Sequence, residues 1–335
     1  MAARFDFHGL VVETASTLSS DPAARLLAPL PGAPEGPGAD LSIRLGPGAG
    51  SDLTPRLPGP DAFVYGVNRL RIAGGRVELA RPGALLTIDG AHVDGLIDPA
   101  QLLEEGGEDL VAQGPLLMAL AVALRSLGCY HLHAAALTLP GLGTVLAPAL
   151  SGSGKSTLAA ALVLSGAGFL GDDTLFVRAD GASARLLALP RDFHLSERSV
   201  EALGLSATLH PGQLTQAGKG RLDAQLRFPG RYAAEAPAPA FILLPRISGE
   251  PATRLEPAGP VQAMGALLES SALVATRGLP GGPGHLPVLA GMADGATSFR
   301  AELGLDLLSD PAGTARALLD RLARAPDGRL GAGRR

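Results

Sequence analysis

The stretch that decides the fold is ALSGSGKST, residues 149–157. An apolar run at residues 144–148 precedes it, and a helical run at residues 157–164 follows it. Glycines allow successive backbone N–H groups to converge on an anion, and the helix behind them presents the positive end of its dipole. The order strand, glycine turn, helix predicts a phosphate-binding loop made of Ser151, Gly152, Ser153, Gly154, Lys155, Ser156 and Thr157.

Two side chains of this loop have expected roles in binding ATP and Mg²⁺. Lys155 is expected to reach the outer phosphates, and the hydroxyl of Ser156 is expected to bind the metal. The usual motif begins with glycine, whereas this chain has the small residue Ala149 there. Gly-Lys-Ser triplets also occur in ordinary surface turns before helices. The flanking strand and helix are what favour nucleotide binding here.

The composition indicates a folded chain and excludes some partners. With 46% hydrophobic residues in 335, the chain has enough apolar side chains for a sizeable core. Its 28 Lys and Arg against 32 Asp and Glu give a formal charge of −4. No overall basic field therefore favours nucleic acid as a partner. The single cysteine, Cys129, and the absence of a recognisable signal segment predict a cytoplasmic location.

The N-terminal part predicts a small antiparallel sheet followed by a helix. Strand patterns occur at residues 4–14, 41–45, 63–65, 70–72 and 77–79, with Gly74-Gly75 suited to a hairpin turn. The pattern then becomes helical, with Pro115 suited to a first helical turn. The longest apolar stretch, residues 115–124, is too short to span a bilayer, so we expect a buried helix and no membrane association.

Two adjacent carboxylates, Asp172 and Asp173, interrupt an apolar strand pattern at residues 169–177. Buried acids are costly without a partner. Mg²⁺ would supply that partner for one carboxylate, and the other could accept the proton of an attacking hydroxyl. The alternative interpretation is a solvent-exposed turn between two short strands, which does not explain the apolar flanks.

A basic segment lies further along, at residues 205–235. It contains four cations, Lys219, Arg221, Arg227 and Arg231, in a polar context rich in turns. Such a cluster is usually a solvated loop, but after a nucleotide core it could also be a lid that closes on phosphates. Beyond it, the sequence predicts a strand at residues 241–244 and helices at residues 261–268 and 312–325.

These motifs together resemble a known family. His133-Ala134-Ala135-Ala136, the turn at residues 141–143, the glycine loop and Gly171-Asp172-Asp173 are similar to the catalytic domain of HPr kinase/phosphorylase and its related proteins, across residues 130–178. The resemblance implies an α/β fold with a P-loop core, related to ATP-dependent phosphoenolpyruvate carboxykinase. We accordingly expect an N-terminal mainly β module at residues 1–110, a kinase-like domain at residues 111–326 and a disordered tail at residues 327–335.

The resemblance also implies a reaction, the transfer of the γ-phosphoryl group of ATP to a serine-like hydroxyl. It implies catalytic roles for Asp172, His133 and Lys155, with Asp172 as the base and His133 near the transferring phosphoryl group. It places Mg²⁺ on Ser156 and Asp173. A lone histidine on a strand is as often structural, and His131 with His133 lacks the third ligand that would predict zinc.

Two family features are not recognisable, and they limit the expected activity. The glutamate- and arginine-bearing signature strand and the phosphorylase loop have no counterpart, so phosphorylase activity and HPr as the acceptor are not predicted. The acceptor can be a protein, a peptide or a small molecule, and the family favours a homo-oligomer. The alternatives are a nucleotide-binding regulatory or scaffold protein with little transfer activity, and a carboxykinase-like enzyme.

Overall fold

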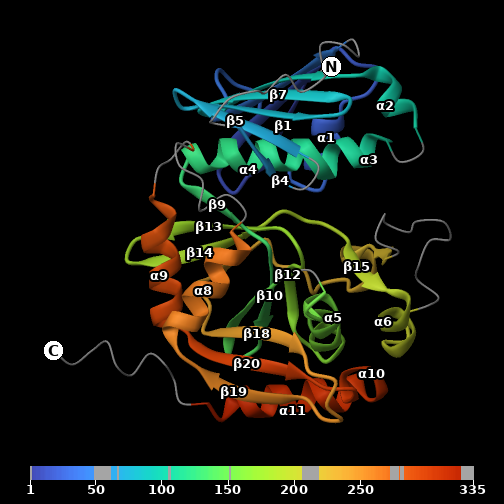
Figure 1. Cartoon of the computed structure of the whole chain (residues 1–335), viewed down its shortest axis with the longest axis vertical. Helices are drawn as coiled ribbons and strands as arrows, with labels where there is room; N and C mark the ends of the chain where they lie inside the picture. Colours follow the sequence, from blue (N-terminus) through green and yellow to red (C-terminus); the bar gives the residue numbers. More distant parts are fainter. Residues whose placement is uncertain are drawn as a thin grey trace. The chain divides into compact units, whose positions relative to one another are not determined.

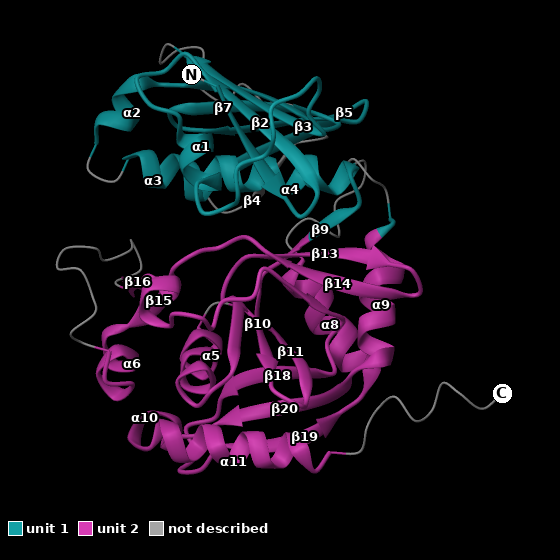
Figure 2. Cartoon of the chain, turned by 180° about the vertical axis from the view of Figure 1, so that it is seen from behind, with its two compact units in different colours: residues 1–130, 275–284 teal, residues 131–274, 285–335 magenta. Residues whose placement is uncertain are grey.

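The computed structural model describes residues 2–48, 62–65, 68–104, 107–150, 152–205, 219–271, 279 and 283–325. It is a mixed α/β structure with several sheets (Figure 1). The chain folds into two compact units. The first contains residues 1–130 and 275–284, and the second contains residues 131–274 and 285–335 (Figure 2). The boundary expected at residue 110 falls inside α3 (Gly107–Val111), which packs within the first unit. The expected tail at residues 327–335 lies outside the described residues.

The first unit is built on an eight-stranded sheet with the order β1-β2-β3-β8-β7-β6-β5-β4. The sheet is mixed, because β3 is parallel to both β2 and β8. The single strand expected at residues 4–14 is a hairpin, since His8 and Gly9 adopt positive φ and turn the chain. Gly74 and Gly75 also have positive φ, which confirms the predicted hairpin turn. The strands are β1 (Ala2–Phe7), β2 (Leu10–Ser16), β3 (Leu41–Pro47), β4 (Ala62–Tyr65), β5 (Asn68–Ala73), β6 (Arg76–Arg81), β7 (Ala84–Asp89) and β8 (His92–Ile97).

A helical run, Gly107–Ser126, packs in this unit and is longer than the sequence predicted. It passes from α3 through a π-helical segment, η1 (Ala112–Leu116), into α4 (Leu117–Ser126), which contacts β7 and β8. Pro115 lies inside η1 instead of in a first helical turn, because the wider π-turn accommodates its missing N–H. Two short helices, α1 (Pro22–Leu27) and α2 (Pro99–Leu103), complete the unit.

The same helical run bears on the membrane prediction. It has 20 residues and a mean hydropathy of 1.3, so by length and composition it could cross a bilayer. The apolar stretch expected from the sequence, residues 115–124, underestimated its length. It is the only such helix in the part of the chain that the structure describes. One helix of this kind is weak evidence, because buried core helices pass the same test, and 61% of its apolar window is buried.

The second unit contains a six-stranded sheet with the order β12-β10-β11-β18-β20-β19. Its centre is three parallel strands, β11 (Gly143–Pro148), β18 (Phe241–Ile247) and β20 (Thr297–Leu303). A two-stranded ribbon, β15-β16, and three strands of a four-stranded sheet, β17-β14-β13-β9, lie in the same unit, whereas β9 spans the boundary at residue 130. The remaining strands are β9 (Cys129–Leu132), β10 (Ala134–Leu139), β12 (Gly168–Gly171), β13 (Leu175–Asp180), β14 (Ser183–Ala188), β15 (Phe193–Ser196), β16 (Lys219–Leu222), β17 (Glu235–Pro237) and β19 (Arg254–Ala258).

Helix α5 (Lys155–Leu164) follows the glycine loop, as the sequence predicted. It is apolar on nearly every side and packs against β10, β15 and α11 (Pro311–Ala323), which fixes the direction of its N-terminus. The helices predicted near residues 261–268 and 312–325 are confirmed as α8 (Pro260–Ser270) and α11. The other helices are α6 (Glu197–Ala202), α7 (Ala224–Arg227), α9 (His285–Gly295) and α10 (Asp306–Ser309).

Candidate functional site

The glycine loop joins the carboxyl end of β11 to the N-terminus of α5. Gly152 and Gly154 both have a φ of 88°, a conformation that residues with a Cβ rarely adopt. Gly154 is also crowded, because a Cβ there would lie 2.6 Å from Cδ1 of Leu303. The predicted order of strand, glycine turn and helix is therefore present. Ser151, which was predicted to contact phosphate, lies outside the described residues.

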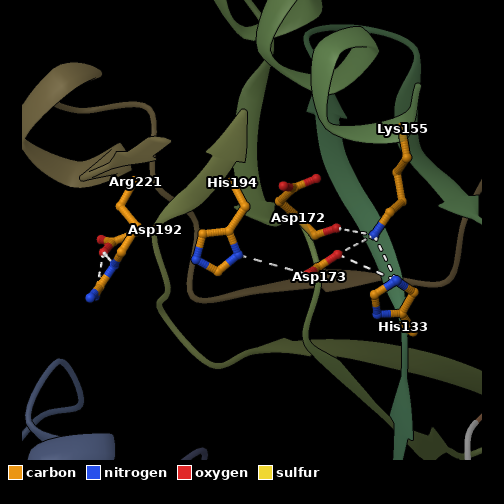
Figure 3. Close-up of polar contacts among 7 residues, drawn as sticks. All are labelled: His133, Lys155, Asp172, Asp173, Asp192, His194 and Arg221. Carbon is orange, nitrogen blue, oxygen red and sulfur yellow. Dashed lines mark hydrogen bonds and ion pairs between the residues drawn. The ribbon is translucent and has the colours of Figure 1, made fainter. Parts of the chain in front are cut away.

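Lys155 is the first residue of α5, and its side chain is only 4% exposed. Its ammonium donates to the carbonyl oxygen of Asp172 at 2.7 Å and to Oδ1 of Asp173 at 2.6 Å. Nε2 of His133 lies 3.4 Å from the same nitrogen (Figure 3). An ammonium has three N–H donors, and the two oxygen atoms take two of them. The structure thus brings together three residues that the sequence singled out separately.

The two aspartates lie on a turn between two sheets and not within one continuous strand. β12 belongs to the six-stranded sheet and β13 to the four-stranded one, and residues 172–174 connect them. Because the backbone turns, the two side chains lie in different surroundings, with the carboxylate of Asp172 directed away from Lys155 (Figure 3). An exposed turn is also the wrong description, since Asp172 is 2% exposed.

Asp172 has an unusual environment for a carboxylate. Both of its carboxylate oxygens are buried and lack a hydrogen-bonding partner among the described residues. Burial raises the pKa of Asp172 to about 6, although the charge of Lys155 opposes the rise. The hydroxyl of Ser156 faces this carboxylate and also lowers the pKa, without a hydrogen bond of normal length and angle. A carboxylate with this pKa can exchange a proton near neutral pH.

Asp173 has the opposite electrostatic character. Its carboxylate lies between His194 on one side and Lys155 with His133 on the other (Figure 3). Burial acts to raise its pKa, but the ring of His194 and the charge of Lys155 outweigh burial and hold the pKa well below its usual range. Nδ1 of His194 is 3.9 Å from Oδ2, longer than an ordinary hydrogen bond. Asp173 is therefore a permanent anion at neutral pH.

Two histidines, His133 and His194, lie beside Asp173, and only His133 was predicted from the sequence. Burial, together with the charge of Lys155, lowers the pKa of His133, so its ring is neutral at neutral pH and Nε2 can accept a hydrogen bond from the ammonium. His194, on β15, was missed. It is a single histidine at the end of a short strand, with no motif or spacing that connects it to the aspartates. Its Nε2 is buried and has no partner among the described residues.

A pocket with a volume of about 350 Å³ opens beside the loop. Its lining includes the loop from Gly152 to Thr157, and also Asp173 and His194, whereas Asp172 and His133 do not line it. Arg198 and Lys219 add two cations to this lining. The pocket is positively charged on the side where the loop would bind an anion.

Of the four cations in the basic segment, three make contacts within the fold and one lines the pocket. Arg221 pairs with Asp192 at 2.8 Å, and Arg231 donates to the carbonyl oxygen of Gly166 at 2.7 Å. The guanidinium of Arg227 lies over the ring of Phe228, 5.7 Å from its centroid. Lys219 is the one of the four that lines the pocket. Residues 206–218, within the expected lid, lie outside the described residues.

A chain of hydroxyl groups connects α5 to α6. The hydroxyl of Thr157 is 2.8 Å from that of Ser199, which is 2.8 Å from that of Ser196. Ser196 also caps α6 by accepting from the backbone N–H of Ser199. Thr157 lies in the first turn of α5, where backbone N–H groups have no acceptor within the helix. The same chain places Arg198 of α6 beside the loop.

The metal-binding potential fits magnesium better than zinc. Within the described ranges, no cluster of three or more His, Cys, Asp and Glu side chains could hold a metal alone. His131 is half-buried, with its ring in an edge-to-face contact with that of Phe176, and desolvation lowers its pKa to about 4, as in a structural histidine. Magnesium in nucleotide sites needs only one or two protein oxygens, with phosphates and water completing the shell. Ser156 and Asp173 line one pocket and meet that requirement.

Comparisons with known proteins give only distant structural likenesses. No protein-family model matches the chain, and no curated protein matches it either. Among solved structures, the Hpr(Ser) kinase/phosphatase from Coxiella burnetii is similar at 14% sequence identity, covering 58% of this chain and 93% of that one. The TM-score is 0.28, too low to establish a common fold. The functional assignment therefore rests on the geometry of the site.

Proposed function

We propose that this chain is an ATP-dependent phosphotransferase that moves the γ-phosphoryl group to a hydroxyl of a protein, peptide or small molecule. The observation that carries the proposal is the convergence of Lys155, Asp173 and His133 at the N-terminus of α5, beside a cationic pocket. A buried lysine with a carboxylate and a glycine turn is the arrangement that binds and activates phosphates in P-loop kinases. The same proposal includes cytoplasmic location and a homo-oligomer, as the sequence predicted.

Binding of ATP·Mg²⁺ is assigned to residues 149–157. Backbone N–H groups around Gly152 and Gly154 would hold the phosphate oxygens, supported by the dipole of α5. Ser156 and Asp173 would hold Mg²⁺, which when bound neutralises charge on the phosphates. Lys155 must then exchange one acceptor for a phosphate oxygen. Its contact with His133, at 3.4 Å, is the longest of the three and the least costly to give up.

Asp172 is assigned as the base that takes the proton of the acceptor hydroxyl. Its pKa of about 6 suits that role, whereas the strongly acidic Asp173 would be a poor proton acceptor. Asp172 is 2% exposed and does not line the pocket, so the acceptor must uncover it, through a shift of the turn at residues 172–174. His133, neutral beside Lys155, would then face the transferring group.

A transfer experiment tests the proposal. The protein is incubated with Mg²⁺ and ATP labelled in the γ-phosphate, together with a panel of serine-containing peptides, small alcohols and small carboxylic acids. We expect label on a hydroxyl acceptor with the wild type and none with Lys155→Ala. Label confined to inorganic phosphate would indicate a nucleotide-binding regulator instead. Label on a carboxylic acid would indicate a carboxykinase-like enzyme.

A further inference from the structure

The pocket beside the glycine loop has a second, apolar end that phosphate binding does not explain. Leu150, Ile247 and Leu305 line it and are 61%, 62% and 51% exposed, respectively. Only ten large hydrophobic residues are exposed in the described part of the chain, and three of them gather here. Buried Leu303 and Leu307 form the floor behind them. Exposed apolar side chains that cluster around a pocket indicate a binding site.

The topology of the sheet explains why these residues meet. Strands β11, β18 and β20 are parallel neighbours, so their carboxyl ends lie at one edge of the sheet. Ile247 and Leu303 are the last residues of β18 and β20 and are paired in register, and Leu150 follows the end of β11. In open α/β sheets, ligands bind in the crevice outside the carboxyl ends of parallel strands.

Hydrogen bonds hold this apolar end in place. The carboxylate of Asp306 accepts from the backbone N–H of Thr253 at 2.9 Å and from its hydroxyl at 2.6 Å. That hydroxyl in turn accepts from the backbone N–H of Gly304 at 2.9 Å, and the N–H of Leu305 donates to the carbonyl oxygen of Glu250 at 2.8 Å. The loops after β18 and β20 are therefore tied together. The exposed side chains are held by a pre-formed wall, which lowers the entropic cost of binding.

The two ends of the pocket are continuous through the loop itself. A Cβ at Gly154 would come within 2.6 Å of Cδ1 of Leu303 and 3.5 Å of Cγ1 of Ile247, so the loop lies against the apolar wall. Lys155, Arg198 and Lys219 line the same pocket. A ligand that fills the pocket would combine an anionic group with an apolar one. Nucleoside triphosphates have this combination.

We infer that Leu150, Ile247 and Leu305 form the nucleobase subsite of the nucleotide whose phosphates bind the loop. This inference rests on the proposed function. The base lies on the side chains of Ile247 and Leu305, against the floor made by Leu303, and gains affinity by burying their exposed carbon atoms. These side chains should therefore contribute to the affinity for a nucleotide but not to the affinity for inorganic tripolyphosphate, which has no base.

Calorimetry with two probes isolates this contribution. ATP and inorganic tripolyphosphate, each with Mg²⁺, are titrated into the full chain and into Ile247→Ser, Leu305→Ser and the double variant. We expect Kd for ATP to rise about tenfold in each single variant and about a hundredfold in the double variant. Kd for tripolyphosphate should stay within about twofold of the wild type.

Matched controls are available, because Val261 on α8 and Leu226 on α7 are exposed apolar residues away from the pocket, at 86% and 77% exposure. Val261→Ser and Leu226→Ser should leave both affinities unchanged. Unchanged ATP affinity in the double variant would overturn the base subsite while leaving the proposed function intact. Equal losses for both probes would also overturn it, because they would mean a distorted loop. A wild type that binds neither probe would overturn the proposed function itself.

Discussion

The ammonium of Lys155 lies 2.6 Å from Oδ1 of Asp173, and the lysine side chain is 4% exposed. A buried ammonium needs a compensating anion, and here Asp173 supplies it. Phosphate oxygens are the natural competitors for the same donors, and Mg²⁺ is the natural competitor for the same carboxylate. Binding of ATP·Mg²⁺ would therefore let a phosphate oxygen take the place of His133 at the ammonium and let Mg²⁺ bind the carboxylate of Asp173, so that neither charged group is left unpaired.

Asp172 should reduce the stability of the ligand-free protein at neutral pH. Its pKa is raised from 3.8 to about 6, so the folded state holds the proton more tightly than the unfolded state. The penalty is absent below the lower value and fully present above the higher one. We expect Asp172→Asn to be more stable than the wild type at pH 7.5, by on the order of 3 kcal/mol, with the gain shrinking towards pH 4. Urea unfolding in the presence of EDTA measures this, and a gain that is independent of pH would contradict it.

The two aspartates should respond differently to removal of their charge. Asp173→Asn should weaken ATP binding more in the presence of Mg²⁺ than in its absence, because it would lose a metal ligand in addition to the anionic partner of Lys155. Asp172→Asn should keep ATP binding and lose about a hundredfold or more in transfer, the scale of a positioned base. Titrations with and without Mg²⁺, together with transfer rates, separate the two variants. Loss of Mg²⁺-dependent binding in Asp172→Asn would exchange the proposed roles.

Nucleotide should protect the basic segment from proteases. Lys219 lines the pocket, whereas Arg221 is held by Asp192, so the ligand would act on the segment through Lys219. We expect ATP·Mg²⁺ to slow cleavage between residues 205 and 235 in the wild type, and to slow it less in Lys219→Ala. Limited proteolysis with mass spectrometry locates the cuts. The same cleavage rate with and without nucleotide would leave this segment as an ordinary loop.

The two loop glycines provide a matched pair. Gly152 and Gly154 share a φ of 88°, but a Cβ at Gly152 would meet nothing within 4 Å, whereas one at Gly154 would meet Leu303. In both alanine variants the left-handed backbone conformation should lower the free energy of unfolding by about 1–2 kcal/mol. Gly154→Ala should be destabilised further by the clash with Leu303, and Leu303→Ala in the same protein should remove that additional loss of stability. A double-mutant cycle from urea unfolding measures the coupling, and additive effects of Gly154→Ala and Leu303→Ala would show that the loop does not press on the wall.

Local patterns were enough to predict the part of the site that lies close together in sequence. The loop and α5 follow from glycine positions and an apolar helix, and Asp172 and Asp173 stood out as acids in an apolar run. The hairpin at Gly74 and Gly75 was similarly local.

Features made by distant segments were not predictable from those patterns. β20 alternates like an ordinary strand, and only its pairing with β18 brings Leu303 to the loop. The same topology brings Ile247 and Leu305 to the pocket, and β15 brings His194 to Asp173. The turn between β12 and β13 was also hidden, because a change of sheet leaves an apolar run intact.

Calorimetric titration of ATP·Mg²⁺ into the wild type and Lys155→Ala tests the central claim most directly. Lys155 is the first residue of the helix behind the loop, and its ammonium forms an ion pair with Asp173. Binding to the wild type and a loss of at least tenfold in affinity for Lys155→Ala are expected, with folding of the variant verified by circular dichroism. Equal ATP affinity in the two proteins, or no binding to the wild type, would contradict the assignment of residues 149–157 as the nucleotide site.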